Sequence, residues 1–360
     1  MSAQRGLWSK ILRKKSILMS LIFLALLFIL STLAYTIIPD NTPDANDQQL
    51  EIALKEPGFS TQFLELPKRS KAVRESGFFQ TLVFGKQRKS DQIPFLDYSI
   101  DKDQVILTNH YGQEKYLSLS TLALSQKTIK DHIHTKTYLL GTDRYGRDIL
   151  SRLILGIRIS LMIGFMSVVL SLVIGITIGA TGAYYGGWID KIAMYMINIT
   201  WSIPTLLLVF AIVMAFGRGL WIIFLAVGLT LWVDVARLVR GQVLKIKEEE
   251  FILATRSLSY STPRIIRSHI LPNIMGPLLV IAATNFAIAI LIEAGLSYLG
   301  FGIQPPSPSV GNMLNENYGY AISGKPFLAI IPAITIMLMV LAFNLVGSGL
   351  RDILDVKSTS

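Results

Sequence analysis

Long apolar runs alternate with short polar segments over most of the chain. The first run covers residues 16–38 and holds no charged residue, and a helix needs about 20 apolar residues to cross a bilayer core. Similar runs follow at residues 160–181, 189–216, 220–238, 276–299 and 326–347. The pattern predicts an all-α polytopic membrane protein with six transmembrane helices.

The N-terminal run fits either a signal peptide or a membrane anchor. A basic segment, residues 1–15, precedes it, and both kinds of element begin with positive charge. A cleaved signal peptide has an apolar core of about 7–15 residues and a small-x-small cleavage site, and this chain shows neither clearly. We therefore expect an uncleaved anchor helix at 16–38, with its basic end in the cytoplasm.

A polar stretch at residues 39–136 separates the first two apolar runs. It contains strand-like runs at residues 61–66, 78–84, 104–108 and 116–119, and a turn signal at Tyr111–Gly112. We expect a small, mostly-β extracytoplasmic insert between the first two spans. His132 and His134 fall on one face of a strand, but no third ligand accompanies them, so no metal site is expected.

Residues 140–161 carry the most distinctive polar pattern. Ile149, Leu153 and Ile157 recur at i, i+4 and i+8, and charged residues fill many of the other positions. This spacing predicts an amphipathic helix lying in the membrane interface, with Thr142 or Asp143 as its N-cap. Two roles stay open, a membrane-surface anchor or a gate at the outer mouth of a pathway. The residues of this motif are Gly141, Thr142, Asp143, Gly146, Arg147, Asp148, Arg152 and Arg158.

The polar segment at residues 240–273 has helix signals of its own. Apolar residues at three- and four-residue spacing predict a helix at 250–258. Residues 259–262 interrupt it, Pro263 begins a second helix, and Pro272 ends that helix. A rigid helix–turn–helix of this kind suits docking into a groove on another protein, with an ordinary cytoplasmic loop as the alternative.

Three positions inside the apolar runs predict local packing or distortion. Gly175 and Gly179 form a small-xxx-small pair, which allows two helices to approach closely. Pro204 lies inside the run at 189–216, where a proline kinks a helix.

Polar groups inside the runs are candidates for a transport pathway. Asp234, Asn285 and Glu293 are the residues concerned, and ionisable groups in a membrane are costly and usually functional. Glu293 has a structural alternative, in which a basic residue such as Arg158 compensates its charge.

Composition supports a membrane protein and argues against other classes. Of the 360 residues, 51% are hydrophobic and 16% charged, against about 25% charged in soluble domains. The net charge of +10 would suit nucleic acid, but the basic residues cluster beside apolar runs, so no nucleic-acid partner is expected. No nucleotide-binding, zinc-protease or serine-hydrolase motif is present, so we expect no enzyme activity in this chain.

The distribution of basic residues predicts the orientation in the membrane. Seven Lys and Arg residues lie between residues 237 and 267, but only Lys325 lies between 300 and 325. The positive-inside rule places the first segment in the cytoplasm. Both termini, including the polar end at 351–360, then lie in the cytoplasm as well.

Several motifs together resemble one family of membrane proteins. Residues 140–143, 146–148 and 151–152, with Gly156, Arg158 and Ser160, are similar to the signature before the second span of ABC importer permeases for dipeptides, oligopeptides and nickel, specifically the C-type subunit. Residues 254–258 and 270–273 resemble the EAA motif, the cytoplasmic loop that docks into the ATPase subunit of these importers. Further similarity lies at residues 296–302, 305–306, 311–314, 344 and 349–352.

The chain departs from the family pattern at a few positions. Ser259 stands where the EAA motif usually has glycine, and Thr255 stands where a second alanine is common. A serine hydroxyl can also interrupt a helix, so we expect the turn to form. The insert before Leu140 is longer than in typical members.

The resemblance implies a fold, partners and site residues. The permease core, residues 137–350, would have the type I ABC importer fold and pair with a homologous B-type permease subunit. Two ABC ATPase subunits would dock on the cytoplasmic loops of the two permeases, which in this chain is the loop at 240–273, and an extracytoplasmic substrate-binding protein would deliver the substrate. The chain itself would hold no cofactor, because ATP would bind to the ATPase subunits. The implied docking residues are Glu249, Glu250, Ala254, Thr255, Arg256, Leu258, Ser259, His269, Leu271 and Pro272.

Other substrates and other classes of protein remain as alternatives. Peptide is the substrate that the resemblance favours, and nickel, opines, antimicrobial peptides or oligosaccharides are the others. A passive channel would need no docking element, and a secondary transporter would run on an ion gradient. A membrane-embedded hydrolase would need a paired nucleophile and base, which the sequence does not offer.

Overall fold

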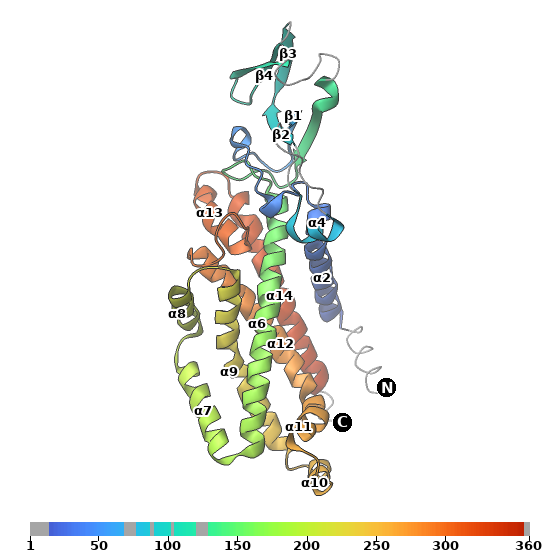
Figure 1. Ribbon diagram of the computed structural model, residues 1–360, viewed down its shortest axis with the longest axis vertical. Coiled ribbons are helices and arrows are strands. Elements are labelled where there is room, and N and C mark those ends of the chain that lie inside the picture. Colours follow the sequence, from blue (N-terminus) through green and yellow to red (C-terminus); the bar gives the residue numbers. More distant parts are fainter. Residues whose placement is uncertain (1–13, 68–76, 87–89, 102–103, 120–128, 356–360) are drawn as a thin grey trace. The chain divides into compact units, whose positions relative to one another are not determined.

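A computed structural model describes residues 14–67, 77–86, 90–101, 104–119 and 129–355, and Figure 1 labels its elements. These residues form two compact units. The first, which we call the bundle unit, takes the described residues of Met1–Phe28, Ile159–Gln304 and Ala333–Ser360. The second, which we call the insert unit, takes those of Ile29–Arg158 and Pro305–Pro332. Most of the two predicted cytoplasmic ends, residues 1–13 and 356–360, lies outside the described residues.

Apolar helices make up most of the chain. Among the described residues, five helices are long and apolar enough to cross a membrane. The number rises to six if the bent pair α7 (Gly187–Ser202) and α8 (Thr205–Phe216) counts as one span. The prediction of six spans agrees with the upper count. The five are α2 (Lys15–Thr32), α6 (Ile149–Tyr185), α9 (Leu220–Ile246), α11 with α12 (Thr262–Tyr298) and α14 (Phe327–Asp355).

The kink predicted at Pro204 is confirmed and is large, because α7 and α8 meet at an angle of 90°. Ile203 leaves the helix with φ −96° and ψ 128°, and Pro204 is the N-cap residue of α8. A proline disfavours helical geometry in the residue before it and removes one backbone hydrogen bond. The chain therefore breaks at Pro204 rather than bending gently.

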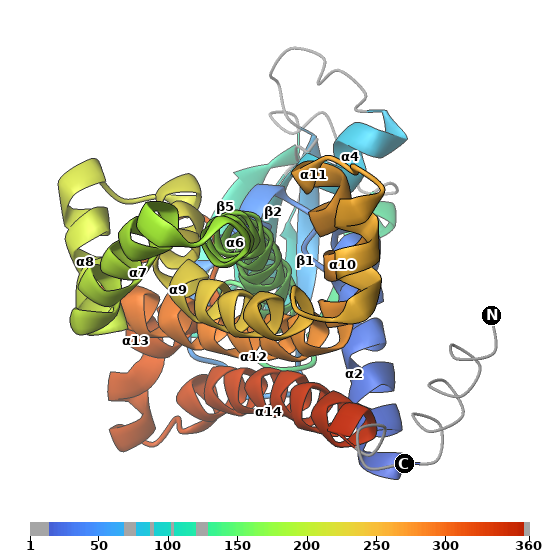
Figure 2. The same ribbon diagram turned by 90° about the horizontal axis from the view of Figure 1, so that it is seen from below.

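Helix α9 is the element against which α7, α8 and α12 (Leu271–Tyr298) pack, and Figures 1 and 2 show these helices beside it. Gly175 and Gly179 of α6 face α9 closely. An added Cβ would lie 2.5 Å from the Val235 Cβ at Gly175 and 2.5 Å from the Ala236 carbonyl oxygen at Gly179. The predicted close packing at this glycine pair is confirmed.

Helix α14 is held in the bundle unit by two kinds of contact. The ring of Phe343 stacks on Phe286 of α12, with centroids 4.1 Å apart. At its far end, Lys14 pairs with Asp352 at 2.9 Å, and Ile17 of α2 lies where a Cβ on Gly349 would be, within 2.3 Å. Because α14 continues to Asp355, the predicted polar end at 351–360 begins as helix.

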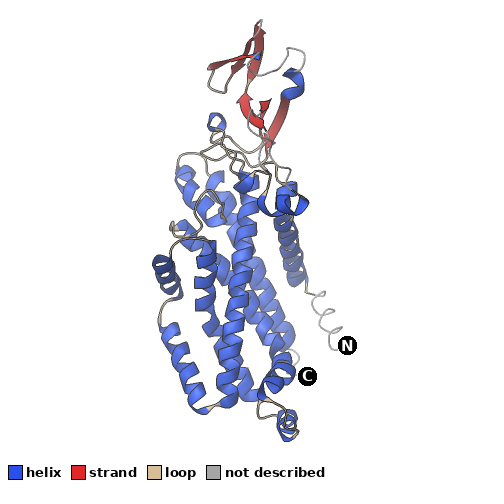
Figure 3. Cartoon of the chain, viewed as in Figure 1, coloured by secondary structure: helices blue, strands red, loops and turns tan. Residues whose placement is uncertain are grey.

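All strands of the described chain lie in the insert unit, as Figure 3 shows. They form two three-stranded antiparallel sheets in the orders β2-β1-β6 and β3-β4-β5. Leu64, Phe95, Val105 and Leu107 form a buried apolar cluster from strands of both sheets. The strands are β1 (Phe59–Pro67), β2 (Ser90–Phe95), β3 (Asp97–Asp101), β4 (Gln104–Thr108), β5 (Glu114–Ser118) and β6 (Ile133–Tyr138).

The strand predicted at residues 78–84 is wrong, because these residues form the helix α4 (Phe78–Phe84). A short apolar run without alternation does not distinguish helix from strand. Gly85 ends α4 with φ +78°, and glycine adopts this conformation without strain. The turn predicted at Tyr111–Gly112 is confirmed, since it joins β4 and β5 and Gly112 has φ +75°. The mostly-β character predicted for the insert is thus seen in part.

The amphipathic interfacial helix predicted at residues 140–161 is also wrong. Residues 140–148 form turns, and α6 runs without interruption from Ile149 to Tyr185. Gly141 and Gly146 have φ of +79° and +72°, a conformation that does not continue a helix. The charged side chains face protein, as described below, rather than lipid head groups.

The segment between α9 and α12 contains short helices. α10 is Glu250–Ser257, α11 is Thr262–Ile265, and a π-helical turn at Ile266–Ile270 connects α11 to α12. Pro272 therefore does not end a helix, which corrects the prediction; it lies in the first turn of α12, where its missing N–H does no harm. The remaining short elements are α3 (Ala34–Ile37), η1 (Pro43–Ala45), η2 (Leu50–Ile52), η3 (Ile129–His132) and α13 (Val310–Ile322).

Candidate functional site

Helix α10 has one face anchored in the bundle unit and one face exposed. Ile252 is fully buried and Thr255 is nearly so, whereas Phe251, Leu253 and Leu258 are 45%, 47% and 66% exposed. Phe251 and Leu258 are seven positions apart and share one side of the helix, whereas Leu253, two positions after Phe251, lies on another side. Exposed apolar side chains of this size are typical of surfaces that contact other proteins.

The anchored face joins α10 to three membrane helices. Ile252 belongs to the same buried cluster as Val243 of α9, Ile265 of α11 and Ile270 of the π-helical turn. At the end of α6, Arg256 donates a hydrogen bond from Nε to the Tyr184 hydroxyl at 3.3 Å. Helix α10 therefore contacts the ends of α6, α9 and the α11–α12 segment through one buried cluster and one hydrogen bond.

The turn after α10 forms around Ser259, which has φ +57°. Its N–H donates to the Arg256 carbonyl at 2.9 Å, and the Tyr260 N–H donates to the Thr255 carbonyl at 3.2 Å. This pair of hydrogen bonds is the Schellman motif that ends many helices, normally with glycine at the left-handed position. The expectation that the turn forms with serine in place of glycine is confirmed.

The other predicted docking residues lie around this turn and the two helix starts. Glu249 is the N-cap residue of α10, and Glu250 lies in its first turn, where negative charge is favourable. Ala254 and Pro272 are exposed, Leu271 is half-buried, and His269 is half-buried with its ring 5.9 Å from Tyr260. Apart from Thr255, which is nearly buried, the predicted docking residues are thus exposed or half-buried.

The motif at residues 141–152 forms a buried charge network in the insert unit. Arg147 donates from Nε to Asp143 at 2.6 Å and from Nη2 to Glu316 of α13 at 2.9 Å. Arg152 lies 3.8 Å from Asp143. Arg147, Asp143 and Arg152 are each no more than 3% exposed, so the network joins this motif to α13 inside protein.

Neighbouring residues of the motif hold the turns that carry the network. The Thr142 hydroxyl donates to the Ile52 carbonyl at 2.5 Å and accepts the Lys55 N–H at 2.9 Å. A Cβ on Gly146 would lie 1.9 Å from the Gln49 carbonyl oxygen, so only glycine fits. Arg158, further along α6, donates to the Leu82 carbonyl at 3.0 Å.

Asp148 is the N-cap of α6. This corrects the expectation that Thr142 or Asp143 would be the N-cap. Its carboxyl accepts the Ser151 N–H at 3.0 Å and is also hydrogen-bonded to the Ser151 hydroxyl. Burial is the main cause that raises the pKa of Asp148 above its ordinary value. This carboxyl therefore favours its uncharged form more than an exposed aspartate does.

The three pathway candidates differ in their surroundings. Glu293 is fully buried and accepts hydrogen bonds from the hydroxyls of Ser160 (2.6 Å) and Ser297 (2.8 Å). Asn285, also buried, donates to the Leu231 carbonyl at 3.4 Å. Both therefore link α12 to neighbouring helices. Asp234 is instead exposed on α9.

Two ionic contacts in the bundle unit were not predicted. Arg240 of α9 makes two hydrogen bonds of 2.7 Å to Asp190 of α7. Arg237 of α9 lies over the Trp201 ring of α7, with Cζ 3.7 Å from the ring centroid. The charges were visible in the sequence, but their partners lie 36 or more positions away in another helix, and no local pattern connects such pairs.

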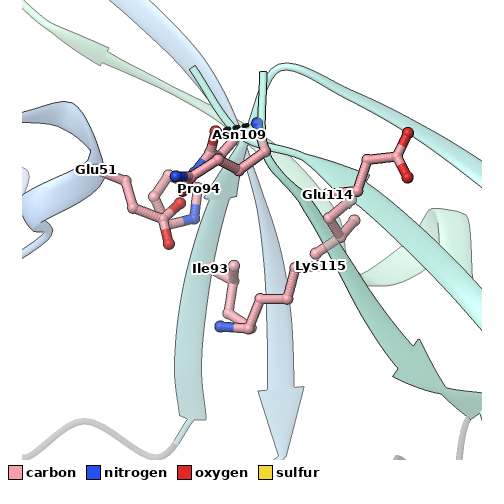
Figure 4. Close-up of a pocket in the computed structure, with 8 residues that line it drawn as sticks. Glu51, Ile93, Pro94, Asn109, Glu114 and Lys115 are labelled. Atoms are coloured by element: carbon pink, nitrogen blue, oxygen red, sulfur yellow. Dashed lines mark hydrogen bonds between the residues drawn. The ribbon is translucent and has the colours of Figure 1, made fainter. Parts of the chain in front are cut away.

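The insert unit carries a shallow hollow of about 240 Å³ beside the β4–β5 hairpin. Figure 4 shows Glu51 on one side of it and the Glu114 carboxylate on the other. Asn109 donates to Gln113 at 3.2 Å, and Glu114 accepts the Tyr116 hydroxyl at 2.5 Å. These polar groups of the hollow are bonded within the hairpin. The lining residues are Glu51, Ile93, Pro94, Leu107, Asn109, Gln113, Glu114 and Lys115.

The five or six apolar helices of the described chain define a class, the multi-pass membrane proteins. The sequence profile described as "Binding-protein-dependent transport system inner membrane component" matches residues 171–359. The chain belongs to this family of ABC transporter permeases.

Two relatives and one solved structure illustrate the similarity. The dipeptide transport system permease protein DppC of Alkalihalophilus pseudofirmus is 41% identical over 220 residues, 61% of this chain and 72% of that protein. The oligopeptide transport system permease protein OppC of Bacillus subtilis is 41% identical over 247 residues, 69% of this chain and 79% of that protein. A chain of the inward-facing MetNI methionine ABC transporter aligns at 20% identity with a TM-score of 0.44, covering 56% of this chain and 97% of that one. The resemblance to dipeptide and oligopeptide permeases is confirmed.

Proposed function

We propose that this chain is the transmembrane permease subunit of an ATP-driven importer of di- and oligopeptides. The family membership and the 41% identity to dipeptide and oligopeptide permeases support this substrate class. The chain would form half of the translocation pathway, and a homologous B-type permease would form the other half. Separate ATPase subunits would hydrolyse ATP, and an extracytoplasmic binding protein would deliver the peptide.

The observation that carries this proposal is the exposed apolar face of α10. Phe251, Leu253 and Leu258 project from a helix whose other face is fixed by Ile252 and Thr255. A helix held this way can enter a groove on an ATPase subunit without moving relative to its own spans. When the ATPase subunits close, α10 would then tilt the attached ends of α6, α9 and α12 as rigid bodies.

The proposed orientation in the membrane agrees with the proposed docking role of α10. The excess of basic residues at 237–267 favours the cytoplasm for α10, which is where ATP is available. With both termini on that side, the insert unit would face outwards and meet the binding protein. The buried network around Arg147 would then position the outer mouth of the pathway, as proposed for the motif from its sequence.

The docking proposal is tested by placing a charge on the exposed face of α10. We expect Leu258→Asp, or Ala254→Arg, to abolish ATP-dependent peptide uptake and the co-purification of ATPase subunits, because a charge cannot enter an apolar groove unpaired. The protein should still accumulate in the membrane, since both positions are exposed.

A matched control is available in the insert unit. Leu50 is 65% exposed, nearly the same as Leu258, so Leu50→Asp introduces the same charge at an equally exposed site. It should retain ATPase subunits in the purified complex. If Leu258→Asp and Ala254→Arg retain them and transport normally, α10 is not the docking element.

A further inference from the structure

We infer that Asp143 is bound alternately by Arg147 and by Arg152 as the importer passes between its inward-open and outward-open states. In the arrangement that the structure shows, Arg147 binds Asp143, and in the second arrangement Arg152 binds it. This inference rests on the proposed function as an ATP-driven importer, and it assigns a role in the transport cycle to the buried charge network.

Both arginines approach the same oxygen atom. The Arg147 Nε lies 2.6 Å from Asp143 Oδ2, and the Arg152 Nε lies 3.8 Å from that same oxygen. The first distance is a hydrogen bond between charged groups, whereas the second is too long for one. The other carboxylate oxygen, Oδ1, already accepts the N–H groups of Tyr145 and Arg147 at 2.9 and 3.0 Å. The two guanidinium groups therefore meet at one acceptor atom.

The Arg152 side chain is incompletely paired in this arrangement. It is 2% exposed, and its buried Nη1 has no hydrogen-bond partner in the described part of the chain. Among its charged neighbours, the repulsion by Arg147 outweighs the attraction by any single carboxylate. Burying a charged donor without a partner costs free energy. The observed arrangement therefore satisfies Arg147 and leaves Arg152 unsatisfied.

Arg147 has other acceptors to which it can remain bound. Its Nη2 donates to Glu316 of α13 at 2.9 Å, and its Nη1 donates to Asn46 Oδ1 at 3.3 Å. A displacement of about 1 Å would bring the Arg152 Nε within hydrogen-bonding distance of Asp143. Each of the two carboxylates would then have an arginine of its own, and neither guanidinium would remain unpaired.

The two arginines lie on different elements, which permits this displacement. Asp143 and Arg147 belong to one closed turn, in which the Asp143 N–H donates to the Arg147 carbonyl at 3.1 Å. Arg152 instead lies in the first turn of α6, which begins at Ile149. A small shift of α6 along or about its axis therefore changes the distance between Arg152 and Asp143 and leaves the closed turn intact.

Helix α6 is also bonded to the docking helix. It continues without interruption to Tyr185, and the hydroxyl of its Tyr184 accepts the hydrogen bond from Arg256 of α10. Helix shifts of about 1–2 Å are typical of switching proteins, and this range includes the shift that Arg152 needs. A movement of α6 that follows ATPase closure would therefore change the partner of Asp143.

The test uses the complete importer with its ATPase subunits and binding protein. Hydrogen exchange of residues 140–152 is recorded without nucleotide and after trapping with ATP and vanadate. In the wild type these amides should be protected in both states, because Asp143 has an arginine in each. In Arg152→Gln they should be protected in only one state. This variant should also take up Ala-Ala about tenfold more slowly, the effect of one lost hydrogen bond to a charged group.

A matched control is Arg144→Gln. The Arg144 Nε is likewise buried without a hydrogen-bond partner among the described residues, but its guanidinium lies over the Tyr145 ring, 4.6 Å from the centroid. The control variant loses the same charge in the same segment, and it should keep wild-type protection in both states and wild-type uptake.

The inference is overturned if Arg152→Gln takes up Ala-Ala at the wild-type rate. It is also overturned if residues 140–152 of this variant are equally protected in the two states, whether that protection is high or low, because Arg152 would then serve the same purpose in both.

The proposed function is tested separately from this inference. Wild-type importer must take up Ala-Ala when ATP is supplied. If it does so while Arg152→Gln gives a contrary result, peptide import stands and the change of arginine partner is wrong. If the wild type takes up no peptide, the proposed function itself is wrong.

Discussion

Charged residues lie inside both units of this protein, but the two units treat them differently. In the insert unit, Arg147 bridges Asp143 and Glu316 at 2.6 and 2.9 Å, and the side chains of Arg147 and Asp143 are at most 4% exposed. In the bundle unit, Asp234 and Arg237 lie one helical turn apart, yet Arg237 stacks on Trp201 instead. The guanidinium of Arg147 is held between two carboxylates, whereas the guanidinium of Arg237 is held by an aromatic ring and an amide oxygen.

The largest loss of stability is expected when the buried network of Arg147, Asp143 and Glu316 is broken. Arg147→Ala would remove the guanidinium that pairs with both Asp143 and Glu316 and leave Arg152, 3.8 Å from Asp143, as the remaining cation; breaking a buried pair costs about 3–5 kcal/mol in comparable cases. We expect the amides of residues 140–152 and α13 to lose protection in hydrogen exchange. Arg144→Ala is the matched control, because the Arg144 guanidinium only lies near the Tyr145 ring, 4.6 Å away, and its loss should cost about 1 kcal/mol or less. Equal effects of the two variants would mean that the network does not stabilise this unit.

An intermediate effect on stability is expected at Asp148, which follows Arg147 in the chain. Because burial raises the pKa of Asp148, the uncharged carboxyl is favoured in the folded state. The contribution of Asp148 to the free energy of unfolding is therefore greatest below the ordinary carboxyl pKa of about 3.9. That contribution is lost as pH rises through the raised pKa. Asp148→Asn should remove this loss, and Asp148→Ala should cost about 1 kcal/mol at every pH by removing the N-cap.

The measurement for Asp148 is the protection of the Ser151 amide, which donates to the Asp148 carboxyl at 3.0 Å. Protection should fall with rising pH in the wild type more than in Asp148→Asn, after correction for the intrinsic exchange rate. An identical pH dependence in both proteins would show that Asp148 does not titrate in this way.

The smallest effect on stability is expected at Asp234 and Arg237, which form no ion pair with each other. Asp234→Asn and Arg237→Gln break no ion pair to each other, so each should change the thermal stability of the assembled importer by about 0.5 kcal/mol or less. A loss of stability as large as that of Arg147→Ala would remove the distinction between the two regions.

Much of the fold follows from local sequence patterns. The apolar runs predicted the membrane helices, because length and composition alone decide whether a helix can cross a bilayer. The turn at Ser259 was also predicted, since a serine hydroxyl can interrupt a helix, although the left-handed conformation that Ser259 adopts was not. The helix α4 was missed, because its short apolar run has no period that separates helix from strand.

The candidate site was predictable as a set of residues but not as a geometry. The docking residues from Glu249 to Pro272 follow one another along the chain, so their grouping needed no knowledge of the fold. The pattern did not reveal that Ile252 and Thr255 face inwards while Phe251, Leu253 and Leu258 face outwards. That division depends on where Val243 and Ile265 lie, which is a property of the assembled bundle.

The sequence by itself determined the apolar spans, the insert and the short helical segment between α9 and α12, because each of these depends on residues close together in the chain. Only the tertiary structure decided the environment of the charges. The amphipathic pattern indicates that Arg147 does not lie among the apolar positions. It does not indicate whether the Arg147 side chain contacts lipid head groups or other parts of the protein. Its partner Glu316 lies 169 positions away, and Ser160 and Glu293 are 133 positions apart. Such contacts depend on the path of the whole chain, because the distance between two side chains in space is not set by their separation in sequence.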